Sequence, residues 1–147
     1  MRKRMSTETP GDYRKRLKKA IDKIFSEWVR RKSGGECFTC GVKKRWKDLE
    51  AGHYIHNKLD FDPMNRRAQC NRCNQHLSGN LGIYGEKLIK EYGTDKIDEM
   101  RLRSNQIWKP DTEELEKLLE YWQMELSKLR ETYVKENHSL VKESVQS

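Results

Sequence analysis

The segments Cys37-Phe38-Thr39-Cys40-Gly41 and Gln69-Cys70-Asn71-Arg72-Cys73-Asn74 decide the fold of this 147-residue chain. Each segment contains a C-x-x-C pair. A tight C-x-x-C turn presents two sulfurs on one side, so two such turns complete the tetrahedron of thiolates that zinc favours. A redox dithiol is the alternative. Glycine at position 41 suits the first turn, and we predict a structural zinc bound by Cys37, Cys40, Cys70 and Cys73.

The composition indicates why this chain needs a metal. Hydrophobic residues make up 34% and charged residues 37% of the sequence, a thin supply for a core. Zinc contributes on the order of 10 kcal/mol to the folding of small zinc modules. The start of the chain does not resemble a signal peptide, and no apolar run is long enough to span a bilayer. We therefore expect a soluble intracellular protein, in which four cysteines favour metal binding over disulfides.

The charge is concentrated in the first third of the chain. The net charge is +8, and residues 1–48 contain 16 Lys and Arg against 6 Asp and Glu, a balance of +10. Residues 49–147 have a balance of −2. A cationic segment of this kind points to a polyanion, most simply nucleic acid, although a solvated lysine-rich helix is the alternative. The predicted DNA-contacting residues are Lys15, Arg16, Lys18, Lys19, Lys43, Lys44 and Arg45.

The N-terminal third is predicted to be a basic flexible arm over residues 1–8 and an amphipathic helix over residues 9–33. Thr9 can cap this helix and Pro10 suits its first position. Apolar residues then recur every three or four positions, and Ser33-Gly34-Gly35 ends the helix. The stripe consists of Tyr13, Leu17, Ile21, Ile24 and Trp28.

Residues 34–104 are predicted to form the cysteine-centred core, with short strands followed by two helices. The first helix contains Tyr84 and Leu88 and stops at Gly93, and Thr94 caps the second.

A long helix is predicted over residues 110–137, followed by a flexible tail at 138–147. Its apolar residues are spaced 4, 3, 4, 3 and 4 apart, which is a heptad seam. We interpret the seam as the contact of a homodimer, and packing on the chain's own domain is the alternative. The seam residues are Leu115, Leu119, Trp122, Leu126, Leu129 and Tyr133.

Between the cysteine pairs lies Glu50-Ala51-Gly52-His53-Tyr54-Ile55-His56, and Asn74 follows the second pair. A histidine on a strand and a polar residue at a helix start are thereby tied to one zinc. This arrangement resembles the ββα-metal (HNH) nucleases, especially the zinc-stapled branch typified by phage endonuclease VII.

The sequence is more closely similar to the phage NinG family, also called Rap recombination endonucleases. The resemblance covers residues 36–104 well and the C-terminal helix loosely, and it leaves the N-terminal helix unplaced. It rests on Cys37-x-x-Cys40-Gly41, on Ala51-Gly52-His53-Tyr54, and on Gln69-Cys70-x-x-Cys73-Asn74-Gln75-His76-x-Ser78-Gly79-Asn80 followed by Tyr84.

The resemblance implies an α+β fold: a small zinc-stapled, HNH-like core flanked by helices. It implies a phage-type endodeoxyribonuclease that hydrolyses phosphodiester bonds in branched recombination intermediates such as four-way junctions and D-loops. His53 would be the general base. A divalent cation, Mg²⁺ or Mn²⁺, would be bound in part by Asn74. Asn65 would hold the hairpin loop so that His53 points correctly.

The sequence departs from the broader HNH pattern at Gly52, where many of these enzymes have an aspartate that binds the metal. The carboxylate ligand is therefore unassigned. Glu50 lies on the same face of the strand as Gly52, and Asp62 and His76 are the other candidates. Asn74 could instead cap its helix, and His56 is predicted to be a surface residue.

Two other functions compete with the nuclease. One is a non-catalytic zinc-ribbon adaptor that binds DNA, and the other is a dimerisation module whose long helix binds a partner protein. Branched DNA and a second copy of the chain are the expected partners, and a membrane is not.

Overall fold

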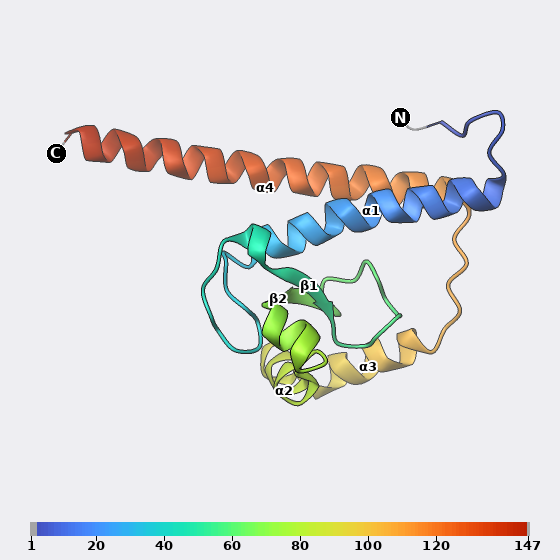
Figure 1. Cartoon of the computed structure of the whole chain (residues 1–147), viewed down its shortest axis with the longest axis horizontal. Helices are drawn as coiled ribbons and strands as arrows, with labels where there is room; N and C mark the ends of the chain where they lie inside the picture. The colour runs from blue at the N-terminus through green and yellow to red at the C-terminus, as the bar shows by residue number, and fades with distance from the viewer. Residues whose placement is uncertain (1–2, 147) are drawn as a thin grey trace.

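The computed structural model describes residues 3–146. Helix α1 (Pro10–Lys32) leads through a short 3-10 turn, η1 (Trp46–Asp48), into an antiparallel hairpin of β1 (Glu50–His53) and β2 (Arg66–Gln69). A short π-helix, η2 (Arg72–His76), then precedes α2 (Leu81–Tyr92), α3 (Thr94–Ser104) and α4 (Thr112–Gln146). The mixed helix-and-sheet class and the long C-terminal helix are as predicted. Figure 1 shows α1 and α4 side by side on one side of the hairpin, with α2 and α3 on the other.

Helix α1 forms where the sequence predicts it. Thr9 Oγ1 accepts a hydrogen bond from the backbone N–H of Asp12 at 3.1 Å, which satisfies one of the free donors of the first turn. The helix ends at Lys32, with Ser33 as its C-cap. In the second half of the helix the buried residues differ from those of the predicted stripe. The buried residues are spaced four apart, and such positions shift gradually around a helix with 3.6 residues per turn. Phe25 and Val29 are buried there, and Ile24 and Trp28 lie half-buried beside them.

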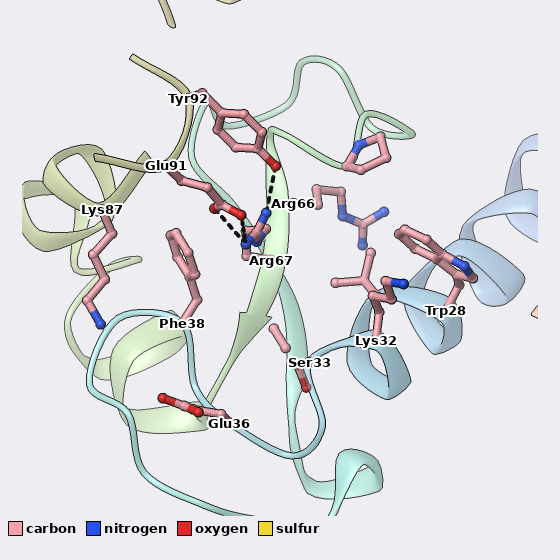
Figure 2. Close-up of a pocket in the computed structure, with 13 residues that line it drawn as sticks. Trp28, Lys32, Ser33, Glu36, Phe38, Arg66, Arg67, Lys87, Glu91 and Tyr92 are labelled. Carbon is pink, nitrogen blue, oxygen red and sulfur yellow. Dashed lines mark hydrogen bonds and ion pairs between the residues drawn. The ribbon is translucent and has the colours of Figure 1, made fainter. Parts of the chain in front are cut away.

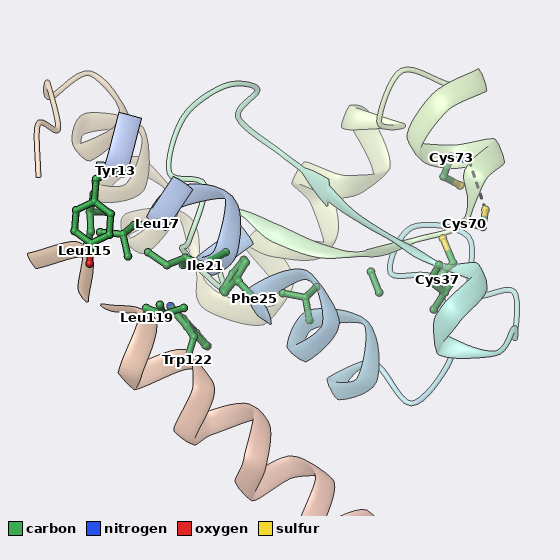
Figure 3. Packing of buried hydrophobic residues seen from close by; sticks show 14 residues of the cluster. Tyr13, Leu17, Ile21, Phe25, Cys37, Cys70, Cys73, Leu115, Leu119 and Trp122 are labelled. Carbon is green, nitrogen blue, oxygen red and sulfur yellow. Dashed lines mark hydrogen bonds between the residues drawn. The ribbon is translucent and has the colours of Figure 1, made fainter. Parts of the chain in front are cut away.

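Helix α4 packs along α1 in the same direction. Trp122 contacts Phe25 edge to face, with ring centroids 4.6 Å apart (Figure 3). Ion pairing continues the contact, because Arg130 Nη2 lies 2.6 Å from Glu27 Oε1. The start of α4 is fixed by a reciprocal capping box, in which Asp111 and Glu114 each accept a hydrogen bond from the other's backbone N–H.

Packing against α1 of the same chain buries most of the predicted heptad seam. Leu115, Leu119, Trp122 and Leu126 are all buried, so intramolecular packing accounts for them. Leu129 is half-buried and Tyr133 is exposed. The four buried residues are therefore not available for a dimer contact. The homodimer stays a prediction that they do not support.

Both ends of the chain were predicted to be flexible, and the structure describes most of their residues. The tail predicted over 138–147 is helical to Gln146, and Ser147 lies outside the described residues. Residues 3–8 of the predicted arm lie along α1, where Arg16 bonds Glu8 and the carbonyl of Lys3; residues 1–2 lie outside the described part. Over the described residues, no helix is both long enough and apolar enough to cross a membrane.

A second small core holds α2 and α3 against the far face of the hairpin. It consists of buried Tyr84, Leu88, Ile97 and Met100. Gly93, with φ 87°, lets the chain turn between the two helices. Gly93 rather than Thr94 is the N-cap of α3, and the Thr94 side chain makes no capping bond. The hairpin thus lies between two cores, which fixes the position of His53 at the end of β1.

Candidate metal and catalytic site

The four cysteines converge on one point, as predicted. Their sulfurs all lie within 4.8 Å of one another, and all four thiols are free of disulfides. Gly41 has a φ of 78° and its N–H bonds the carbonyl of Cys37 at 2.9 Å, so glycine does ease the first turn. In the second turn, the N–H of Cys73 points to the sulfur of Cys70 at 3.5 Å. This geometry fits a closed four-sulfur zinc site.

The surroundings of Cys37 favour the thiolate form that a metal requires. Burial raises the pKa of Cys37, but hydrogen bonds from the Thr39 hydroxyl and from backbone N–H groups outweigh it and lower this pKa to about 6. Asn80, predicted only as a motif residue, donates its side-chain N–H to the sulfur of Cys73 at 3.7 Å. The backbone N–H of Val42 lowers the pKa of Cys40, but burial and hydrogen bonds with the other three cysteine sulfurs outweigh it and raise this pKa to about 12. Zinc binding must therefore release the proton of that thiol.

The cysteine cluster fastens η2 to the hairpin. One cysteine pair precedes β1 and the other follows β2, so a single metal would clamp the open end of the hairpin to η2. Asn74 lies in the middle of η2, not at its start, which excludes a capping role. Its Oδ1 lies 2.8 Å from the point where a Cβ on Gly52 would be. Asn74 therefore faces the strand position next to His53.

His53 lies at the end of β1, with its ring beside Asp60. Its side chain is 22% exposed, and its Nε2 lies 3.0 Å from Asp60 Oδ1. Burial, followed by the charge of Arg66, lowers the pKa of His53 below its usual value, and the bond to Asp60 only partly offsets this. The Asp60 carboxylate accepts a hydrogen bond from Nε2–H, which leaves Nδ1 of the neutral ring as the acceptor.

Sequence reasoning missed Asp60. It lies in the loop between the strands, and its only signal was a carboxylate seven residues after His53. Arg66 reinforces this contact, because its guanidinium bonds the Asp60 carbonyl at 2.9 Å and Asp22 of α1 at 2.6 Å. Arg66 is also buried, so it connects α1, the hairpin and the loop that carries Asp60.

Asn65 spans the same loop, in the position the sequence predicted for it. The side chain is fully buried. Its Oδ1 accepts from the N–H of Ile55 at 2.7 Å, and its Nδ2 donates to the carbonyls of Ile55 and Lys58 at 3.1 and 2.8 Å. These bonds fix the chain on both sides of the loop. Asn65 is thus a positioning residue for the segment between His53 and Asp60.

The structure does not gather the three candidate metal ligands. Glu50 accepts hydrogen bonds from the side chains of Asn71 and Gln75. Asp62 is engaged by Arg103 at 2.8 Å and by the N–H of Met64. His76 is exposed at the end of η2. Within residues 3–146, the four cysteines are the only group of three or more His, Cys, Asp or Glu side chains close enough to share a metal.

His56 is exposed, as predicted, with its ring 6.2 Å from that of His53.

The predicted DNA-contacting residues divide into free and paired cations. Lys15, Lys18 and Lys19 are exposed on α1, and Lys18 lies over the ring of Trp108 at 5.4 Å. Arg16 instead forms a two-bond ion pair with Glu8, at 2.8 and 2.9 Å, because the start of the chain lies along the helix. In the cysteine region Lys44 is exposed, whereas Lys43 pairs with Glu36 and Arg45 with Asp48.

A cavity of about 550 Å³ lies on another part of the surface, between α1, β2 and α2 (Figure 2). In it Arg67 bonds Glu91 and Tyr92 and lies over the ring of Phe38. His53, Asn65 and Asn74 do not line it. The candidate site is therefore separate from this cavity.

These features define a class: a small helical protein in which a four-cysteine cluster joins a β-hairpin to a short helix. The profile described as "Bacteriophage Lambda NinG protein" matches residues 2–132. The chain belongs to this family.

Several curated relatives support the assignment. The chain is 39% identical over 75 residues to "Protein ninG" of Escherichia phage 933W, a match that covers 47% of this chain and 36% of that protein. It is 35% identical over 103 residues to "Protein ninG" of Salmonella phage P22, covering 65% of this chain and 48% of that protein. The matched segments thus span half or less of these relatives. No solved structure matches the chain.

Proposed function

We propose that this chain is an HNH-type, divalent-metal-dependent endodeoxyribonuclease that cuts branched DNA recombination intermediates. The observation that carries the proposal is His53, a neutral imidazole oriented by Asp60. The residue before it in the chain, Gly52, faces Asn74. A general base needs this neutral form near neutral pH, and the lowered pKa of His53 supplies it.

In the proposed reaction His53 Nδ1 removes a proton from the water that attacks the phosphorus, and the bond from the phosphorus to the 3′ oxygen breaks as that oxygen leaves. The positive charge that develops on the ring is stabilised by Asp60, 3.0 Å from Nε2. Asn65 and Arg66 hold the loop that carries Asp60, so their effect on the reaction passes through the orientation of His53. A divalent cation bound beside Asn74 would stabilise the charge that appears on the phosphate in the transition state.

The exposed lysines of α1 suit a DNA substrate. Lys15, Lys18 and Lys19 project from α1, which packs against both strands of the hairpin. Exposed lysines of this kind neutralise phosphates and give binding without sequence preference. The preference for branched DNA comes from the family resemblance.

The experiment is incubation of a labelled four-way junction with the zinc-loaded protein, in Mg²⁺ and separately in EDTA, with zinc retention checked after each. Cleavage that requires the divalent ion supports the proposal. Retardation of the junction without cleavage would instead establish a DNA-binding adaptor. Neither retardation nor cleavage would favour a module that binds a partner protein.

A further inference from the structure

Gln69, the last residue of β2, has a buried oxygen with nothing to bind. The residue is 0% exposed, and its Nε2 donates to the hydroxyl of Thr39 at 3.1 Å and to the carbonyl of Gly79 at 2.8 Å. A carbonyl only accepts hydrogen bonds, so the amide nitrogen must face Gly79 and the oxygen must face the other way. In the part of the chain that the structure describes, Gln69 Oε1 has no hydrogen-bond partner.

The same oxygen converges with Asn74 on Gly52. A Cβ placed on Gly52 would lie 2.8 Å from Asn74 Oδ1 and in hard contact with Gln69 Oε1. Two amide oxygens therefore approach the same side of Gly52, where a Cβ would displace the Gln69 oxygen. A buried acceptor left unpaired destabilises the fold. A cation bound by both oxygens would remove this cost.

We propose that Gln69 Oε1 and Asn74 Oδ1 are the protein ligands of the divalent cation, and that Gly52 is required because any side chain there would displace the Gln69 oxygen. This inference rests on the proposed function. Amide oxygens are hard ligands that suit Mg²⁺ and Mn²⁺. The ligand that the broader HNH pattern supplies from the residue before the histidine is here supplied from the opposite strand.

The absence of a carboxylate has a consequence for binding. Two neutral oxygens bind a divalent ion more weakly than charged ligands do, and water completes the coordination shell. The ion therefore exchanges readily, whereas the zinc of the cysteine cluster is retained. This difference allows the second ion to be titrated separately.

The test is Mn²⁺ binding to zinc-loaded protein, followed by electron paramagnetic resonance without DNA. The unmodified protein should bind one Mn²⁺ in addition to its zinc. Gln69→Met and Gly52→Ala should each weaken Mn²⁺ binding by at least about tenfold. Gly52→Ala is the complementary variant, because it keeps both amides while its Cβ would push Gln69 Oε1 out of place. Unchanged Mn²⁺ affinity in both variants would overturn the inference.

Matched controls make the same changes where no effect is expected. Gln75→Met removes an exposed amide on η2 that bonds Glu50. Gly82→Ala adds a Cβ where no atom lies within 4 Å. Both should retain the Mn²⁺ affinity of the unmodified protein. If the control variants bound Mn²⁺ as weakly as the two site variants, the loss of affinity would reflect a general loss of structure. The site variants would then no longer support the inference.

A second measurement needs no variant and so does not depend on folding of one. During a Mg²⁺ titration of the unmodified protein, the ¹³Cδ resonance of Gln69 should shift and that of Gln75 should not. No shift at Gln69, as expected if only a water molecule fills the space, would overturn the inference. Junction cleavage is scored separately: Mg²⁺ bound at Gln69 without cleavage would refute the nuclease and leave the cation site standing.

Discussion

Replacing Asn65 by alanine should destabilise the protein and loosen the loop that orients His53. The change removes one accepted and two donated hydrogen bonds, at 2.7, 2.8 and 3.1 Å, from a fully buried side chain. A hydrogen bond of this kind contributes about 1 kcal/mol net. Water can reach part of the half-buried loop, so the expected loss is about 2–3 kcal/mol.

A loss of this size leaves the protein folded, because small domains are stable by about 5–15 kcal/mol. For a chain of this length it corresponds to a fall of roughly 5–10 °C in melting temperature. Thermal and urea denaturation measure this change directly. Amide hydrogen exchange should in addition show faster exchange at Ile55, whose N–H loses its acceptor.

Asn71→Ala is the matched control. Asn71 is exposed and makes a single long bond to Glu50 at 3.4 Å, so its loss should change stability by less than about 0.5 kcal/mol. If Asn65→Ala were as stable as this control, with unchanged exchange at Ile55, the loop would not depend on Asn65 and its role for His53 would be refuted.

Three further predictions concern the metal, the base and the DNA surface. Cys70→Ser should lose bound zinc and melt at a lower temperature, and elemental analysis that still finds one zinc per chain would contradict the four-sulfur site. Because the pKa of His53 is lowered, its base form persists as the pH falls, so the acid limb of the cleavage rate should lie below about pH 6.5. Asp60→Asn removes a group that raises this pKa, so it should shift the acid limb to lower pH. An acid limb at the same pH would show that Asp60 does not act on His53. Lys15→Ala, Lys18→Ala and Lys19→Ala together should reduce the salt dependence of DNA binding by up to about three units of log–log slope, whereas an unchanged slope would place these lysines away from the DNA.

The parts of the fold that the sequence predicted depend on local patterns. Helix α1 could be predicted from the cap at Thr9 and the apolar stripe, and the cysteine cluster from the spacing of the two pairs. The break between α2 and α3 followed from Gly93. In each case residues close in the chain determine the local geometry.

The parts that could not be predicted depend on contacts between distant residues. A heptad spacing is the same whether the partner helix belongs to the same chain or to another, so it did not reveal that Trp122 packs on Phe25. Asp60 reaches His53 only because Asn65 and Arg66 shape the loop between them. The unpaired oxygen of Gln69 arises from Thr39 and Gly79, which bond the other end of its amide.

The most direct test of the account is the cleavage of a four-way junction by the unmodified protein and by His53→Ala, with zinc content and junction binding measured on the same samples. With Mg²⁺ present, His53→Ala should cleave at least about 100-fold more slowly, as expected for loss of a general base. Its zinc content and junction affinity should be unchanged. Cleavage at the normal rate by His53→Ala, or no cleavage by the unmodified protein, would contradict the account.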